Sequence, residues 1–211
     1  INPILMSNTP KNSKFHILMH ALDAVPFRPT DLIFDYDSTI ARVPIDWPTA
    51  RPQFRDYLNS LVPDLDLADG MRVDEMEATI LQQTDLAPPL VFQYREELES
   101  SLRGNHEPIQ EVIDLIRAVQ QQSDVRLFIV SNNLAGTVSD GLAQLGLLEC
   151  FTHIYGVDTV GLPKPYTKAA ELLNADYQVD LNKTVFFGDS PPTDGLFCER
   201  LGIRFINIKD I

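Results

Sequence analysis

Cysteine and positive charge are both scarce in this chain of 211 residues. Cys150 and Cys198 are too few for a disulfide framework, so we expect reduced thiols in a cytoplasm. Lysine and arginine number 17 against 30 aspartates and glutamates, and the formal net charge of -13 argues against nucleic acid or an anionic membrane as a partner. No apolar run approaches the roughly 20 residues of a membrane helix. These absences predict a cytoplasmic protein.

What remains is the composition of an ordinary globular domain, with 44% hydrophobic and 22% charged residues. Apolar, β-rich runs predict strands over residues 32–34, 126–130, 153–157, 184–187 and 204–208. Helical spacing predicts helices over 14–25, 108–122, 134–145, 166–174 and 195–201. Strands that alternate with helices indicate a parallel sheet covered on both faces. The expected class is therefore α/β, with a Rossmann-like three-layer core.

The stretch from residue 44 to residue 104 has a different character, because it shows no strand-like alternation. Apolar residues recur at helical spacing in three segments, 48–61, 71–84 and 88–102. Proline lies near the start of two of these segments. We interpret 44–104 as a helical insertion, and 1–43 with 105–211 as the core.

Polar side chains follow three of the predicted core strands, at Asp35 and Asp37, at Ser131, and at Asp189. The carboxyl ends of parallel strands meet at one edge of a sheet, where ligands bind. Three carboxylates gathered there repel one another unless they are protonated or bind a cation. Oxygen ligands without histidine or cysteine favour Mg²⁺ over zinc.

Two further features suit an anion. Ser131 and Asn132 place a hydroxyl and free backbone N–H groups between a strand and a helix, although such a pair is also a common helix cap. Lys164 lies between two prolines that restrict the backbone, which suits a fixed positive charge facing phosphate. An exposed loop lysine is the alternative for Lys164.

Taken together, these residues resemble the haloacid dehalogenase (HAD) superfamily over residues from about 32 to 208. The helical insertion resembles the cap of that family's capped phosphatase branch, which includes phosphoglycolate phosphatases. The four family motifs are matched in order by Asp35-Tyr36-Asp37-Ser38-Thr39, by Ser131, by Lys164, and by Gly188-Asp189 with Asp194.

The resemblance implies an enzyme that hydrolyses small phosphorylated metabolites. Asp35 is then the nucleophile that forms an aspartyl-phosphate, and Asp37 is the general acid and base. The implied ligands of Mg²⁺ are Asp35, Asp189 and the backbone carbonyl of Asp37, and Asp194 is implied to act on the metal through water or to orient the site. The implied phosphate-binding residues are Thr39, Ser131, Asn132 and Lys164. Closure of the cap is expected to hinge near residues 41–45 and 103–107.

Several alternatives within and beyond the family stay open. Ser38 resembles phosphoserine phosphatases, whereas Ser131-Asn132 resembles phosphoglycolate phosphatases, so the substrate is undetermined. The presence of Asp37 argues against a dehalogenase, and the absence of lysine between Lys14 and Lys164 argues against cleavage of carbon–phosphorus bonds. A phosphomutase related to β-phosphoglucomutase and a non-catalytic binding or regulatory module remain as alternatives.

Arginines in and near the insertion are candidates for contacts with the rest of the substrate. Arg42 follows the first motif, and Arg51 and Arg55 lie on the first predicted helix of the insertion, so we favour these three. The other candidates are Arg72, Arg95 and Arg103, and Trp47 and Tyr57 are candidates for the entrance.

Overall fold

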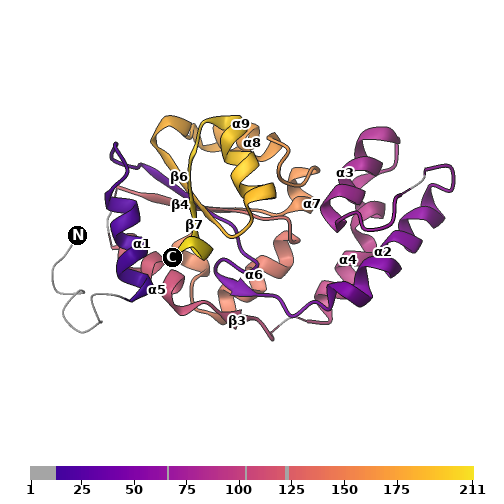
Figure 1. Ribbon diagram of the computed structural model, residues 1–211, viewed down its shortest axis with the longest axis horizontal. Helices are drawn as coiled ribbons and strands as arrows, with labels where there is room; N and C mark the ends of the chain where they lie inside the picture. The colour runs from indigo at the N-terminus through magenta and orange to yellow at the C-terminus, as the bar shows by residue number, and fades with distance from the viewer. Residues whose placement is uncertain (1–12, 66, 103, 122–123) are drawn as a thin grey trace.

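The centre of the molecule is a sheet of five parallel strands (Figure 1). The computed structural model describes residues 13–65, 67–102, 104–121 and 124–211. The strand order is β5-β4-β1-β6-β7, so the first strand lies in the middle. The strands are β1 (Asp31–Phe34), β4 (Arg126–Val130), β5 (His153–Tyr155), β6 (Thr184–Gly188) and β7 (Arg204–Asn207). The expected parallel α/β architecture is confirmed.

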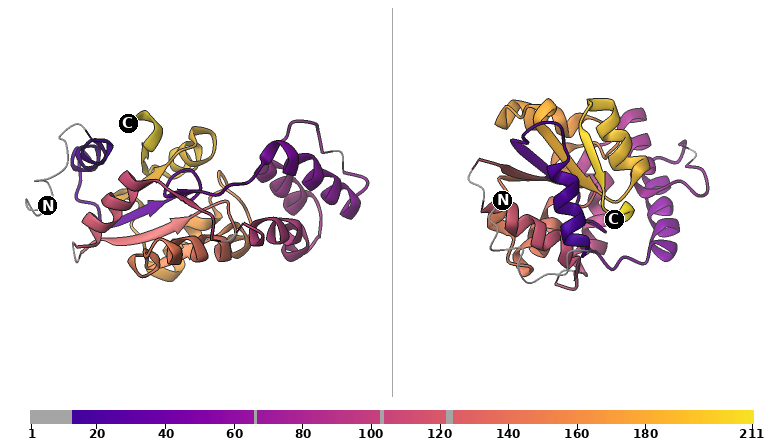
Figure 2. Two further views of the ribbon diagram at one scale, coloured as in Figure 1. Left: turned by 90° about the horizontal axis from the view of Figure 1, so that it is seen from below. Right: turned by 60° about the vertical axis from the view of Figure 1, so that its left-hand side comes forward.

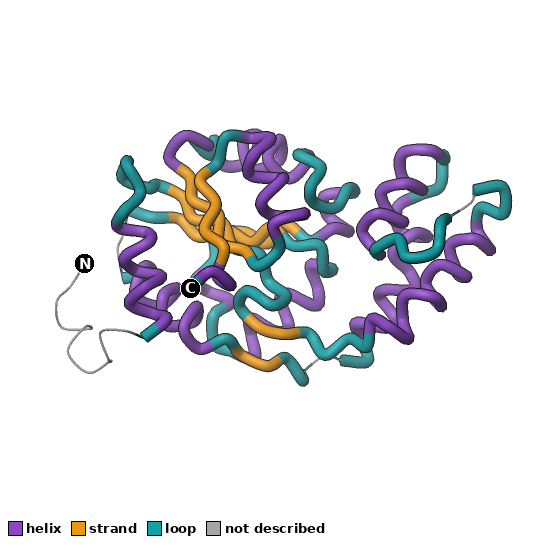
Figure 3. The backbone as a smooth tube through the Cα atoms, in the orientation of Figure 1, coloured by secondary structure: helices purple, strands orange, loops and turns teal. Residues whose placement is uncertain are grey.

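Helices cover both faces of this sheet, as the strands between helical layers in Figure 3 show. Leu32 and Phe34 of β1 pack into a core with α1 (Lys14–Asp23), α5 (Gln110–Gln120) and α6 (Ala135–Gln144). Ile33 packs into a second core on the other face, with α7 (Val157–Val160), α8 (Lys168–Tyr177) and α9 (Leu196–Leu201). Burial on both faces explains why β1 is a continuous apolar run.

The segment between the core halves folds as three helices, which lie to one side of the sheet in Figures 1 and 2. These are α2 (Trp47–Leu61), α3 (Val73–Gln83) and α4 (Pro88–Ser100). They share an apolar cluster of their own, which includes Phe54, Leu58, Met76, Ile80 and Val91. The expected helices are therefore present, and we call α2, α3 and α4 the helical insertion.

The two linkers to the helical insertion lie side by side in an antiparallel ribbon that the sequence did not predict. It consists of β2 (Ala41–Arg42) and β3 (Glu107–Pro108), and strands of two residues are too short to give a sequence pattern. Beside the ribbon, the buried Tyr36 hydroxyl and His106 Nδ1 share a hydrogen bond of 2.6 Å. A Cβ on Gly141 would lie 1.8 Å from the Tyr36 hydroxyl oxygen, so glycine is needed for this contact.

Local differences from the expected elements occur mostly at their ends. The strand expected over 153–157 stops at Tyr155, because Val157 begins α7 and its N–H donates to the Asn133 carbonyl. A π-helical turn, Pro191–Gly195, precedes α9. Short 3-10 turns complete the chain at Leu148–Cys150, Leu181–Lys183 and Ile208–Asp210. In the part of the chain that the structure describes, no helix is both long and apolar enough to cross a membrane.

Candidate active site

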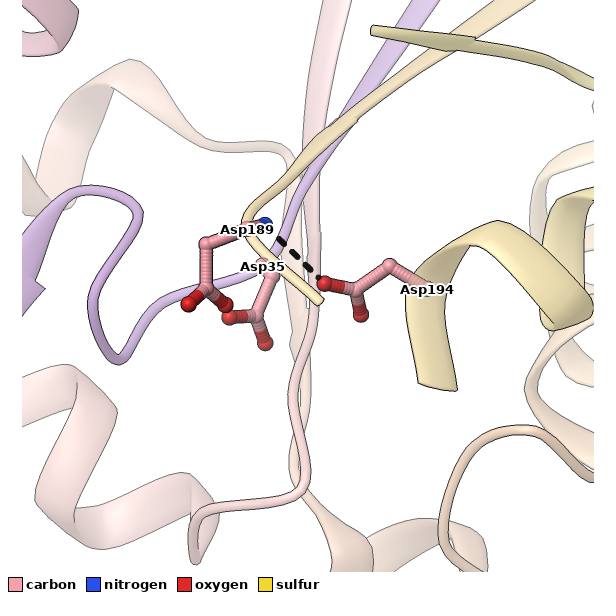
Figure 4. Close-up of side chains that lie close together, drawn as sticks. All are labelled: Asp35, Asp189 and Asp194. Atoms are coloured by element: carbon pink, nitrogen blue, oxygen red, sulfur yellow. Dashed lines mark hydrogen bonds between the residues drawn. The ribbon is translucent and has the colours of Figure 1, made fainter. Parts of the chain in front are cut away.

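Three aspartates from two distant parts of the sequence meet at the carboxyl edge of the sheet (Figure 4). Asp35 follows β1, Asp189 follows the adjacent strand β6, and Asp194 lies on the π-helical turn. A carboxylate oxygen from each of the three lies within 4.8 Å of the others. Convergence of the strand ends therefore produces an acidic cluster, but the Asp37 carboxylate, which the sequence analysis grouped with Asp35 and Asp189, is not one of its three members.

Lys164 lies buried between two of these carboxylates. Its Nζ donates to Asp35 Oδ1 at 2.7 Å and to Asp194 Oδ1 at 2.6 Å. Burial by itself would lower the pKa of Lys164, but Asp194 and Asp35 raise it overall, so the ammonium group stays charged. Asn132 holds this loop, since its Oδ1 accepts from the Lys164 N–H at 2.7 Å and its Nδ2 donates to the Lys164 carbonyl at 3.1 Å.

Asp35 has an unusual electrostatic environment. Burial raises the pKa of its carboxyl to about 7, against the opposing effect of Lys164, and the neighbouring Asp194 adds to the rise. The Thr39 hydroxyl, itself buried, donates to Asp35 Oδ2 at 3.3 Å. One lysine does not offset several carboxylates, so a bound cation would lower the free energy of the ionised cluster.

Asp37 lies two residues further along the same loop and also faces the cavity described below. Its Oδ1 accepts from the Val43 N–H at 2.9 Å, which fixes the carboxyl group. Burial raises the pKa of Asp37 to about 6, although the hydrogen bond from Val43 opposes this rise. A carboxyl group with this pKa can both donate and accept a proton near neutral pH.

Gly188 is required by the position of Asp194. A Cβ on Gly188 would lie 2.4 Å from Asp194 Oδ2, which is closer than atoms can approach. The same Oδ2 accepts hydrogen bonds of 3.1 Å from the N–H groups of Asp189 and Ser190. Glycine therefore allows the Asp194 carboxylate to fold back over the loop that carries Asp189.

The turn after β4 is organised by its own side chains. The buried Ser131 hydroxyl accepts from the Asn133 N–H at 3.2 Å and lies 3.3 Å from Asn133 Oδ1, to which it donates. Asn132 and Asn133 line the cavity, whereas Ser131 and Thr39 do not. The structure thus brings all the predicted phosphate-binding residues to this edge, but two of them lie beneath the surface of the cavity.

A cavity of about 350 Å³ opens above the carboxylates, between the sheet and the helical insertion. This volume suits a small metabolite. From the core, its lining includes Asp35, Asp37, Ser38, Asn132, Asn133, Lys164, Asp189, Ser190, Pro192, Thr193 and Asp194. From the helical insertion and the loop before α3, the lining includes Trp47, Arg51, Arg72, Val73, Asp74 and Arg95.

The arginines of the cavity differ from the three that the sequence favoured. Arg51 lines it, but Arg42 is exposed on β2 beside a different hollow. Arg55, one turn after Arg51 on α2, forms an ion pair with Asp69 beside a further hollow that Arg51 also borders. Arg72 and Arg95 line the cavity instead. Helix packing decides which face turns inward, and sequence spacing alone did not distinguish these arginines. Arg103 lies outside the described residues, and Tyr57 does not line the cavity.

Arg95 belongs to a buried charge cluster that sequence analysis missed. Its guanidinium donates to Glu77 at 3.0 and 3.1 Å and to Glu99 Oε1 at 2.5 Å. Glu99 Oε2 in turn accepts from the Leu134 N–H, at 3.2 Å, in the core. One guanidinium cannot neutralise two carboxylates, and burial raises the pKa of Glu77 to about 7. The cluster joins α3 and α4 to the turn after β4.

The acidic cluster fits a hard divalent cation. Asp35, Asp189 and Asp194 supply carboxylate oxygens and no histidine or cysteine takes part in the described cluster, a donor set that suits Mg²⁺. Asp189 is also paired with the exposed Lys209, whose Nζ lies 2.5 Å from Asp189 Oδ2. This pairing was not predicted, because Lys209 comes from the last turn of the chain.

Solved structures with similar folds include three with informative descriptions. The HAD phosphatase of Thermococcus onnurineus is 19% identical, with a TM-score of 0.56 and 86% of each chain covered. A predicted phosphoglycolate phosphatase of Haemophilus somnus is 17% identical, with a TM-score of 0.56 and 86% of each chain covered. The magnesium-bound HAD-hydrolase YfnB of Bacillus subtilis is 23% identical, with a TM-score of 0.53 and coverage of 85% of this chain and 88% of that one.

These likenesses establish the fold alone. No curated protein matches the chain significantly. The family model of haloacid dehalogenase-like hydrolases matches residues 32–208, which include all four motifs and the helical insertion. The chain therefore belongs to the haloacid dehalogenase-like hydrolase family.

Proposed function

We propose that this protein is a Mg²⁺-dependent phosphatase that hydrolyses small phosphomonoesters through an aspartyl-phosphate on Asp35. The observation that carries this proposal is the meeting of Asp35, Asp189 and Asp194 around the Nζ of Lys164. Membership of a hydrolase family supports it, as do the phosphatases among the structures with a similar fold.

In the first step, a carboxylate oxygen of Asp35 bonds to phosphorus while the bond from phosphorus to the ester oxygen breaks. The electron pair leaves with that oxygen, and the protonated Asp37 carboxyl donates its proton to it. Lys164 holds Asp35 Oδ1 at 2.7 Å, which leaves Oδ2 with a single, longer hydrogen bond from Thr39. We therefore assign Oδ2 as the attacking atom.

In the second step, the ionised Asp37 accepts a proton from water as the water oxygen bonds to phosphorus. The bond between phosphorus and Asp35 breaks, releasing inorganic phosphate and restoring the carboxylate. Lys164 and the N–H group of Asn132 stabilise the phosphoryl oxygens, since the N–H groups of Ser131 and Asn133 already donate within the protein.

The residues that would hold Mg²⁺ are Asp35, Asp189, Asp194 and the backbone carbonyl of Asp37. When bound, the ion supplies positive charge that offsets the phosphoryl oxygens and the carboxylates. Lys164 would keep its ion pairs with Asp35 and Asp194, which restrain both carboxylates.

We also propose that the helical insertion is a cap, with residues 44–104 as its limits. The cavity has walls from both regions, so closure of the helices over the core would exclude water during phosphoryl transfer. Movement between domains is described for YfnB. Structures with and without a phosphate analogue would test closure, and an unchanged cap angle with an open cavity would contradict it.

The decisive experiment measures phosphate release from a panel of small phosphomonoesters, with Mg²⁺ and with EDTA. We expect turnover that requires Mg²⁺ and is abolished in Asp35→Asn, because an amide cannot attack phosphorus. Asp56→Asn is the matched control, since Asp56 is exposed on α2. Each variant is checked for folding by circular dichroism.

Absence of release from every ester, by folded protein with Mg²⁺ bound, would contradict the phosphatase proposal. Conversion of one sugar phosphate into another without net release would identify a phosphomutase instead. Turnover that survives Asp35→Asn would exclude Asp35 as the nucleophile.

A further inference from the structure

Carboxylates predominate at the core end of the cavity and arginines at the other end. The core end holds the carboxylates of Asp35, Asp37, Asp189 and Asp194 with Lys164, and these are the groups that the proposed phosphatase reaction uses. The end formed by the helical insertion holds three guanidinium groups, from Arg51, Arg72 and Arg95. The phosphatase reaction gives these arginines no role.

Two of the three arginines are neutralised within the protein. Arg72 donates to both carboxylate oxygens of Asp74, at 3.1 and 2.9 Å. Arg95 lies between Glu77 and Glu99, as described above. Their charges and most of their donors are already used, so they contribute to the shape of the cavity more than to its free positive charge.

Arg51 differs from both. Its guanidinium makes no hydrogen bond or ion pair with any other residue in the described ranges, so its buried Nε, unlike the equally unpaired Nε of Arg95, belongs to a group with no anionic partner at all. Arg55, one turn further along α2, has Asp69 as its partner. A buried charged donor without an acceptor raises the free energy of the unliganded protein. Such a group is stabilised when a ligand supplies an oxyanion.

We propose that Arg51 binds a second oxyanion on the substrate, a carboxylate or a phosphate on the alcohol part of the ester. This inference rests on the proposed phosphatase function. A guanidinium group presents parallel N–H donors that match the two oxygens of such a group. The substrate class is therefore a small phosphomonoester with a second anionic group, of a size that fits about 350 Å³.

The overall charge of the protein gives Arg51 a role in selectivity. A second negative charge on a ligand is unfavourable near a chain with a net charge of -13, unless a cation lies beside it. Arg51 supplies that cation at the end of the cavity away from Lys164, so the two anionic groups are bound separately. An ester with a neutral alcohol part leaves Arg51 unpaired.

The test compares 2-phosphoglycolate, which carries a carboxylate, with 2-hydroxyethyl phosphate, which has a neutral hydroxyl in its place. The measured quantity is the ratio of kcat/KM for these two esters with saturating Mg²⁺. In the wild-type protein we expect the ratio to exceed 10, and in Arg51→Met we expect it to fall at least 30-fold. A parallel series with ethylene glycol bisphosphate shows whether the second group is a phosphate.

Arg55→Met is the matched control, because it removes an arginine from the same helix outside the cavity, and its ratio should stay within threefold of wild type. Arg51→Lys, which keeps the charge but loses the paired donors, should recover part of the ratio. A ratio unchanged in Arg51→Met, or a wild-type preference for the neutral ester, would overturn the inference. Turnover of either ester shows separately that the phosphatase proposal holds, and turnover of neither ester nor of the bisphosphate would contradict that proposal.

Discussion

The sheet core and the helical insertion both bury a cation between two carboxylates, but they assemble these clusters differently. In the core, Lys164 bridges Asp35 and Asp194, which lie 129 and 30 residues away in the sequence. In the helical insertion, Arg95 bridges Glu99 on the next turn of α4 and Glu77 on the neighbouring helix α3. The core cluster depends on the order of strands in the sheet, whereas the cluster around Arg95 depends on which faces of α3 and α4 pack together.

This difference also separates the expected roles of the two clusters. Lys164 contacts the carboxylate that we assign as the nucleophile, so its removal should affect the reaction most. Arg95 contacts no carboxylate of the core cluster, and its partner Glu99 accepts from the Leu134 N–H of the core. Its removal should affect stability most. Variants of the two clusters therefore test whether the core cluster governs activity and the cluster of the helical insertion governs stability.

The largest effect is expected for Lys164→Met. We expect kcat to fall roughly 1000-fold at saturating Mg²⁺, because one fixed positive charge is lost from the phosphoryl site. Steady-state phosphate release measures this. Lys168→Met is the control, since Lys168 is exposed on α8 and paired with Glu171. A fall of less than tenfold in Lys164→Met would show that the core cluster is structural.

The next effect is expected for Arg95→Met. Removal of the guanidinium leaves two buried carboxylates without their cation, so we expect the free energy of unfolding to fall by about 4 kcal/mol. Urea denaturation measures this quantity. Arg28→Met removes the exposed ion pair with Asp124 and should change it by less than about 1 kcal/mol. Equal effects of the two variants would contradict the structural role of the buried cluster.

A smaller effect concerns the pH dependence of stability through Glu77. Its pKa is about 7 in the folded protein, against an ordinary value of 4.5, so the folded state binds more protons between these values. The resulting stabilisation, up to about 3 kcal/mol, is complete below pH 4.5 and is lost as pH rises through 7. Glu77→Gln should flatten the free energy of unfolding over this range.

The exposed Glu96 on α4 provides the control for that measurement. Glu96→Gln should leave the slope against pH as in the wild type. The opposite result is a free energy of unfolding that rises with pH between 4.5 and 7 in the wild type, with the rise lost in Glu77→Gln. It would show that Glu77 is ionised in the folded protein throughout this range.

The smallest effect contrasts left-handed backbone positions of the two regions. The helical insertion has Gly70 at a φ of 85°, whereas the core has Ser38 at a φ of 60°, beside the cavity. Side chains disfavour this conformation. Ser38→Gly should raise the free energy of unfolding by about 0.5 to 1 kcal/mol, and Gly70→Ala should lower it by a similar amount. Thermal melts measure both, and destabilisation by Ser38→Gly would contradict the expected strain.

The sequence allowed prediction of most of the core site, because strand ends in a parallel sheet meet at one edge. Asp35, Asp189 and Lys164 needed only this rule and the family resemblance to be found. The contact of Asp194 with Lys164 was not predicted from the sequence, since it depends on the π-helical turn that carries Asp194. Asn132 and Thr39 stay predicted phosphate-binding residues, and the hydrogen bonds of their side chains to Lys164 and Asp35 were not predicted.

Prediction was weaker in the helical insertion. The existence of α2, α3 and α4 followed from apolar spacing, but the orientation of each arginine did not. Arg51 and Arg55 lie four residues apart, and only Arg51 lines the cavity. The difference lies in their partners, since Arg55 forms an ion pair with the exposed Asp69. The pairing of Arg95 with Glu77 likewise depends on the packing of two helices and not on local sequence.

The hydrogen bond between Tyr36 and His106 has a mechanical consequence. Tyr36 stands between Asp35 and Asp37, and His106 lies in the linker that returns from the helices, next to the ribbon that ties both linkers together. Any rotation of the helices that displaces His106 must stretch this 2.6 Å bond or carry Tyr36 with it. Movement of the helical insertion and movement of the loop that carries Asp35 and Asp37 are therefore coupled through this hydrogen bond.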